Sequence, residues 1–272
     1  MTGAAAPDEK QMRLRYPGKC HLCGATLAAG TLAVYERTAR RVRCIDCNAS
    51  AANAVILLEE NVAGTSARRE YDRRKASRER RVRAKYPKLG GLILALTDEP
   101  QSTRAWHQGA IGEELLAQRL KDLPEPVRIL NDRRIRGTNA NIDHIIILPS
   151  GVWVADAKRY KGKRPTLHVE GGLLRHRVES LRVGGRDGTR LVDGVKNQVV
   201  QVAATLDDCE IPVRGILCFL EAQWPLIGGG FTVEGVDIVW PRLLVERVAA
   251  APDAGVDVAA VALKLAMAFP AA

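Results

Sequence analysis

Aromatic side chains are scarce in this sequence of 272 residues, where Phe, Trp and Tyr together make up 4%. No run approaches the roughly 18 to 20 apolar residues that a membrane-spanning helix needs. The first ten residues, MTGAAAPDEK, lack the basic and then apolar order of a signal peptide. These absences argue against a membrane-embedded or secreted protein, and we expect a cytoplasmic one.

Acidic residues are outnumbered by basic ones, with 31 Asp and Glu against 41 Lys and Arg and a net charge of +10. Such an excess favours a polyanionic partner, with nucleic acid as the first candidate and an anionic membrane surface as the second. Hydrophobic residues at 46% and charged residues at 26% are typical of a soluble globular protein. At roughly 100 to 200 residues per domain, the length suggests two domains.

Four of the six cysteines form two pairs with two residues between the partners: Cys20, Cys23, Cys44 and Cys47. This spacing lets each pair place two thiolates on one metal ion, so we predict a structural zinc ribbon over residues 15–50. Zinc would supply folding free energy that so few large apolar side chains cannot. Cys209 and Cys218 lie in or beside apolar sequence, and we expect both to be inert core thiols.

A basic segment follows the ribbon. From Ala67 to Lys88 the sequence is rich in Arg and Lys and poor in apolar residues. It cannot bury a helix face, so it is either a solvated helix or a disordered linker. We assign residues 51–104 to this basic helix or linker.

Residues 105–272 are expected to form an α/β domain, because helical and alternating apolar patterns follow one another. The predicted elements are a helix at 106–123, strands at 127–135, 141–149 and 151–160, a hairpin around 171–172, a helix at 193–206, a strand at 213–221 and an apolar C-terminal helix at 256–269. A tight Pro-Ser-Gly turn joins the second and third strands, so the three strands are predicted to form an antiparallel meander.

Two carboxylates and an ammonium are predicted to share one face of this meander. Residues two apart in a strand point the same way, so Asp156 and Lys158 project together, and the Pro-Ser-Gly turn can bring Asp143 alongside. Such charges on an apolar strand pair are costly unless they bind a cation or pair tightly. The pattern therefore indicates a Mg²⁺ or Mn²⁺ site at Asp143 and Asp156, with a surface ion pair as the alternative.

The preceding helix supplies another acid. Glu113 stands at the end of the apolar stripe formed by Leu116, Ala117 and Leu120, which predicts that it faces inward. Glu114 is followed by Gln118 and Lys121, four and seven positions on, and is expected to face solvent. The alternative is that Glu113 merely favours the positive amino end of its helix.

The segments GAIGEELLAQRL, LNDRRI, NIDHIIILPSGVWVADAKRYKGK and NQVVQ resemble the nuclease-related domain family, NERD, a branch of the PD-(D/E)xK nuclease superfamily. The resemblance covers roughly residues 105–220 and implies a restriction-endonuclease-like core of helix, three-stranded meander, helix and strand. The residues at the family's expected active-site positions are Glu113, Asp143, Asp156 and Lys158. Asn197 and Gln201 match a later helix of the family, which makes Gln201 a further candidate catalytic residue; Gln198 replaces the usual proline and lies close enough to substitute for Gln201.

The resemblance implies a Mg²⁺- or Mn²⁺-dependent nuclease that hydrolyses phosphodiester bonds, with DNA as the favoured substrate and DNA processing or repair as the setting. A basic run after the third strand would grip substrate phosphates: Arg159, Lys161, Lys163 and Arg164. The alternative is a catalytically inactive nucleic-acid-binding adaptor that binds through the zinc ribbon and basic helix. A membrane partner is not expected, because the basic segment has no apolar face to insert.

Overall fold

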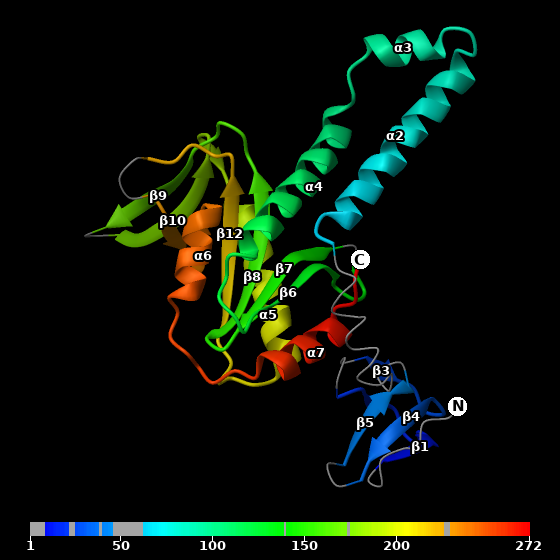
Figure 1. Cartoon of the computed structure of the whole chain (residues 1–272), viewed down its shortest axis with the longest axis vertical. Helices are drawn as coiled ribbons and strands as arrows, with labels where there is room; N and C mark the ends of the chain where they lie inside the picture. The colour runs from blue at the N-terminus through cyan, green and yellow to red at the C-terminus, as the bar shows by residue number, and fades with distance from the viewer. Residues whose placement is uncertain are drawn as a thin grey trace.

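The computed structural model describes residues 9–21, 25–37, 40–45, 62–138, 140–172, 175–225 and 229–272. Within these ranges the largest sheet has six strands in the order β13-β14-β12-β8-β7-β6 (Figure 1). Its strands are β6 (Arg128–Arg134), β7 (Asn141–Leu148), β8 (Gly151–Arg159), β12 (Val213–Leu220), β13 (Phe231–Val233) and β14 (Val236–Val239). The sheet is the centre of a mixed α/β domain, as the sequence predicts.

The predicted antiparallel meander is confirmed. β6 pairs with β7 and β7 with β8 in antiparallel register, whereas β12 pairs with β8 in parallel register. Gly151 makes the β7–β8 turn possible, since its φ is +134° and a Cβ there would lie 2.6 Å from the carbonyl oxygen of Pro212. The sequence did not indicate β13 and β14, which extend the sheet beyond β12.

Helices cover both faces of the sheet (Figure 1). Their bounds are α4 (Gln101–Leu120), α5 (Thr189–Leu206), α6 (Pro241–Ala249) and α7 (Val258–Ala268). A hydrophobic core lies on each face of the sheet, and successive residues of β7 point to opposite faces. Ile145 packs with α5 and α7, whereas Ile146 packs with α4 and α6. Both isoleucines are fully buried. Helix α6 was not predicted from the sequence, whereas the other three helices were.

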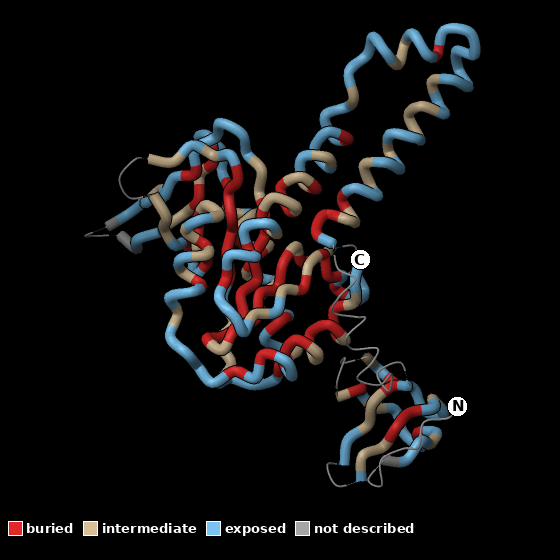
Figure 2. Tube along the Cα trace, in the orientation of Figure 1, coloured by how far each residue is buried: buried red, intermediate tan, exposed pale blue. Residues whose placement is uncertain are grey.

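A helical arm extends away from the sheet (Figure 1). It consists of α2 (Thr65–Lys85), α3 (Gly90–Leu96) and the first turns of α4. The basic segment is thus a helix, and it is mostly exposed, as the pale blue tube in Figure 2 shows. Aromatic contacts join α2 to α4: the rings of Tyr71 and His107 are 4.8 Å apart, and the Arg74 guanidinium lies 5.6 Å from the Trp106 ring centre.

Small sheets complete the described part of the chain. The N-terminal strands are β1 (Glu9–Arg13), β2 (Gly18–Lys19), β3 (Thr26–Leu27), β4 (Leu32–Glu36) and β5 (Arg41–Cys44), and they form a sheet β1-β4-β5 and a pair β2-β3. The predicted hairpin around residue 171 is β9 (Pro165–Gly172) with β10 (Arg175–Val183), and β11 (Arg186–Asp187) adds a third strand. No helix among the described residues is both long and apolar enough to cross a bilayer.

Candidate active site

Three neighbouring strands carry an aspartate at the same level of the sheet. The pairs Asn131↔His144 and Arg133↔Ile142 place Asp132 opposite Asp143, and the pair His144↔Ala155 places Asp143 next to Asp156. The β7–β8 ladder ends here, because the carboxylate of Asp143 accepts a 2.9 Å hydrogen bond from the backbone N–H of Ala157. The two strands therefore part where the acids lie.

Lys158 forms an ion pair with Asp156, on the same face of β8 as the alternation predicts. Asp156 is only 8% exposed. Burial raises the pKa of Asp156 to about 7; Lys158 opposes this shift, and the charge and hydrogen bond of Asp143 add to it. Burial would lower the pKa of Lys158, but Asp156 and Asp143 outweigh that effect and raise it, so the ammonium form is favoured. Asp143 and Asp156 are close enough to repel each other.

Glu113 is buried and faces these groups from α4, as its spacing predicts. Its Oε2 accepts a 3.0 Å hydrogen bond from the backbone N–H of Gly64, at the start of α2. Burial, followed by repulsion from Asp143 and Asp132, raises the pKa of Glu113 to about 9. Glu114 differs from the expectation of a solvated side chain, because it is about one third exposed and forms an ion pair with Arg68 of α2.

Asp132 is an acid of this region that sequence reasoning missed. It is 2% exposed and has a φ of +46°. Its carboxylate accepts hydrogen bonds from the backbone N–H of Ser66 at 2.6 Å, the hydroxyl of Ser66 at 2.7 Å and the amide of Asn141 at 3.0 Å. Gly64, the residue that precedes α2, supplies no side-chain cap, so Asp132 and Glu113 together satisfy free backbone N–H groups at that helix terminus.

Two of these acids, Glu113 and Asp143, line a cleft of about 610 Å³ between α4, β7 and β8. Its lining includes Glu113, Asp143 and Lys158, together with the partly exposed aromatic rings of Trp106 and Tyr160. Ala67 from the first turn of α2 also lines it. The cleft therefore combines buried carboxyl groups, an ammonium group and aromatic side chains. These groups suit a phosphate ester that carries a nucleobase.

Other predicted residues lie in different settings. Gln201 is exposed on α5, whereas Gln198 donates a 3.2 Å hydrogen bond to the carbonyl oxygen of Asn141. Arg159 is held by Gln108 and by a 2.9 Å ion pair with Glu221. The other residues predicted to contact phosphate follow β8 in the chain and are exposed: Lys161, Lys163 and Arg164. Gln198 is thus nearer than Gln201 to the strand that carries Asp143.

The predicted zinc ligands fall partly outside the described residues, namely Cys23 and Cys47. Cys20 and Cys44 are buried together, and the backbone N–H of Cys44 donates to the Cys20 sulfur at 3.3 Å. The expectation for the two other thiols is confirmed for Cys218, which is buried, and wrong for Cys209, which is exposed. Cys209 lies beyond the end of α5 among polar neighbours, so no apolar surface covers it.

Residues 108–220 match the family model described as NERD, nuclease-related domain. No curated protein and no solved structure matches the chain significantly. The matched range contains Glu113, Asp143, Asp156 and Lys158, whereas the cysteine pairs and α2 lie outside it. The cleft and its acids thus belong to a nuclease-related domain, and the chain carries a NERD domain over residues 108–220.

Proposed function

We propose that this protein is a metal-dependent nuclease that hydrolyses phosphodiester bonds, with DNA as the favoured substrate. The supporting observation is that Glu113, Asp143 and Lys158 of the nuclease-related domain line one cleft, with the buried Asp156 paired to Lys158 beside it. Two strands and a helix contribute these groups, in the order expected of a restriction-endonuclease-like core. A setting in DNA processing or repair is part of this proposal.

The donor chemistry fits Mg²⁺ or Mn²⁺, which prefer carboxylate oxygens. Asp143 and Asp156 would hold the ion, because they lie side by side and burial opposes charging Asp156 unless a cation compensates. Among the described residues no three His, Cys, Asp or Glu side chains are grouped to hold a metal, and Glu113 already accepts the N–H of Gly64. When bound, the ion would polarise the scissile phosphate and acidify a water molecule.

Lys158 would neutralise negative charge that develops on the phosphate. Its ion pair with Asp156 holds it as an ammonium at the cleft, and an ammonium donates hydrogen bonds but cannot accept a proton. We therefore assign it charge stabilisation rather than the role of a base. The exposed Lys161, Lys163 and Arg164 would hold more distant phosphates.

We also propose a structural zinc ion at the N-terminal ribbon, held by Cys20, Cys23, Cys44 and Cys47. The buried pair Cys20 and Cys44 fits this, since an N–H donor to a sulfur favours its thiolate form. The ribbon, at residues 15–50, and the region of the basic helix, at 51–104, would then bind nucleic acid beside a nuclease domain at 105–272.

A second candidate function is an inactive nucleic-acid-binding adaptor. It is favoured by the fact that the chain itself already engages two groups of the site: Glu113 through Gly64, and Asp156 through Lys158. The exposed basic helix α2 would supply affinity in either case.

Cleavage of labelled DNA and RNA, single- and double-stranded, tests the two candidates. The proposed nuclease requires cleavage with Mg²⁺ or Mn²⁺, none with a chelator, and a loss of at least about a hundredfold in Asp156→Asn. Asp122→Asn is the matched control, because Asp122 is exposed and its side chain makes no hydrogen bond or ion pair with the described residues. Cleavage by Asp156→Asn at the wild-type rate would refute the nuclease site, and binding without cleavage by any form would establish the adaptor.

A further inference from the structure

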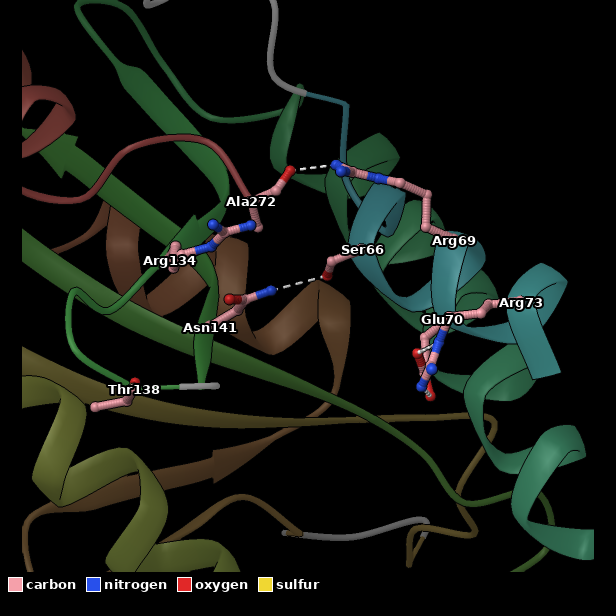
Figure 3. Close-up of a pocket in the computed structure, with 8 residues that line it drawn as sticks. All are labelled: Ser66, Arg69, Glu70, Arg73, Arg134, Thr138, Asn141 and Ala272. Atoms are coloured by element: carbon pink, nitrogen blue, oxygen red, sulfur yellow. Dashed lines mark hydrogen bonds and ion pairs between the residues drawn. The ribbon is translucent and has the colours of Figure 1, made fainter.

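A second cavity, of about 420 Å³, adjoins the first turn of α2 (Figure 3). Consecutive residues of that turn line different cavities, because Ala67 faces the carboxylate cleft and Ser66 faces this one. Three arginines line it, Arg69 and Arg73 from α2 and Arg134 from β6, and none of the acids of the carboxylate cleft does. The two cavities are therefore neighbours on either side of the start of α2, and the buried acids lie in only one of them.

The cavity keeps a positive charge after its internal ion pairs are counted. Its acid, Glu70, is bound by both Arg73 at 2.7 Å and Arg74 at 2.5 Å, so two guanidinium groups share one carboxylate. Arg69 donates to an oxygen of Ala272, the last residue of the chain. Even when that oxygen is counted as part of a carboxylate, Arg74, which lies beside the cavity rather than in its lining, leaves one positive charge in excess at Glu70.

Arg134 adds a further positive charge. Its side chain makes no hydrogen bond or ion pair within the part of the chain that the structure describes, and Figure 3 shows it lying across the cavity from Ser66. The guanidinium of Arg134 is therefore available to an anion that enters the cavity.

The neutral polar groups of the cavity are already occupied. The Asn141 amide donates to the Ser66 hydroxyl at 2.9 Å, and the Thr138 hydroxyl donates to the carbonyl oxygen of Ile135 at 3.0 Å. Recognition of a ligand therefore falls to guanidinium groups. Their planar arrays of N–H donors suit phosphate oxygens, which they can bind in pairs.

The cavity continues into a second basic cavity along α2. Arg73 lines both, and Arg74, Arg78 and Arg81 line the second. From Ser66 to Arg81 the helix rises about 22 Å at 1.5 Å per residue, which matches roughly six phosphates of one strand at 3.4 Å each. A row of this length fits a polymer better than a single small anion.

We infer that the cavity bounded by Arg69, Arg73 and Arg134 binds a backbone phosphate of the nucleic acid and positions the strand beside the carboxylate cleft. The inference rests on the proposed function for its choice of ligand. It assigns a binding role to Arg134, a residue of the sheet edge that lies outside the basic segment recognised in the sequence.

The test compares Arg134→Gln with Arg128→Gln. Both arginines are exposed on β6, but Arg128 does not line the cavity and lies at the other end of the strand. Affinity for a labelled DNA duplex is measured without added Mg²⁺ or Mn²⁺, so that no cleavage is expected, over a range of salt concentrations. Arg134→Gln is expected to bind roughly tenfold more weakly at low salt and to reduce the salt slope by about one, whereas Arg128→Gln stays close to wild type.

Equal effects of the two variants would overturn the inference. Titration with inorganic phosphate separates the possible sources of the anion: saturable binding of phosphate that Arg134→Gln abolishes, without any effect on DNA affinity, would also overturn it. Because affinity is measured without cleavage, a selective loss in Arg134→Gln supports the phosphate site even if Asp156→Asn shows that the proposed nuclease function is wrong. If Arg134→Gln binds DNA as well as wild type while Asp156→Asn loses cleavage, the phosphate site is wrong and the proposed nuclease function stands.

Discussion

The backbone N–H of Gly64 donates a 3.0 Å hydrogen bond to Oε2 of Glu113, so an acid of the candidate site holds the start of the basic helix. Gly64 has a φ of +78°, and a Cβ there would lie 2.8 Å from the carbonyl oxygen of Ala110. Gly64→Ala is expected to lower the free energy of unfolding by about 1 to 3 kcal/mol, because both the backbone and the contact are strained. Chemical denaturation measures it.

The matched control is Gly91→Ala, in α3. A Cβ at Gly91 would meet no atom within 4 Å, and its φ lies outside the positive region. The alanine should stabilise this exposed helix by up to about 1 kcal/mol. A Gly64→Ala protein as stable as the Gly91→Ala protein would show that the close approach to Ala110 is not needed.

The pH dependence of stability should reveal Glu113. Its pKa is raised to about 9 from 4.5, so the folded state binds more protons than the unfolded state between these values. The free energy of unfolding must then fall as pH rises through this window, by at most about 1.4 kcal/mol per pH unit. Glu113→Gln keeps an acceptor for Gly64 but cannot ionise, so its melting temperature without metal should fall less from pH 5 to pH 8. Parallel curves would contradict this prediction.

Ser66 should contribute to the attachment of the arm, because its hydroxyl donates to Asp132 at 2.7 Å and accepts from Asn141 at 2.9 Å. Ser66→Ala is expected to cost about 1 kcal/mol or more, since it leaves the amide of Asn141 with one acceptor fewer in a partly buried place. Ser77→Ala, at a half-buried position of the same helix, corrects for helix propensity. Chemical denaturation of the two variants measures the difference in their free energies of unfolding. Equal values would contradict a stabilising role for the hydrogen bonds of the Ser66 hydroxyl.

Purified protein should contain one zinc ion per chain by elemental analysis. Cys44→Ser should lose it, because the buried Cys44 is one of the proposed ligands. Cys209→Ser should retain it, because Cys209 is exposed and far along the chain from both pairs. Full zinc content in the Cys44→Ser protein would contradict the proposed zinc site in the ribbon.

The exposed loop after β8 offers a test of substrate contacts. Lys161→Gln combined with Arg164→Gln should weaken DNA binding and lower the salt slope by up to about two, because each side chain would release one counterion. The rate of cleavage at saturating DNA should stay near that of wild type. A fall in that rate with unchanged affinity would instead assign these residues to the chemistry.

Local patterns were sufficient to predict much of the domain. Alternation predicted the meander and the shared face of Asp156 and Lys158, and helical spacing predicted that Glu113 is buried. The role of Asp132 was not predicted from the sequence, because it depends on a contact with Ser66, sixty-six positions away. It also depends on a positive φ that no sequence pattern indicates. The environment of Cys209 was predicted wrongly because the apolar residues nearby in the sequence do not cover it, and its immediate neighbours Asp208 and Glu210 are polar.

The pairing of β12 with β8 and the strands β13 and β14 depend on contacts between distant segments. Short runs such as Phe231–Val233 carry too little periodicity to be recognised alone. The same limit explains why sequence spacing could bring Asp143 near Asp156 but could not show that the start of α2 reaches Glu113.

Helix α4 runs without a break from Trp106, which contacts Arg74 of the arm, to Glu113 in the cleft. Seven residues, about 10 Å of helix, separate these two points. The start of α2 is bonded to the same helix, through Gly64 to Glu113 and through Arg68 to Glu114. The arm is therefore joined to the core where α2 begins and where α4 continues into the domain. In a nuclease such an arm would serve as a ruler: the bond that is cut would lie at a constant offset from the stretch of duplex that the arm grips, whatever its base sequence.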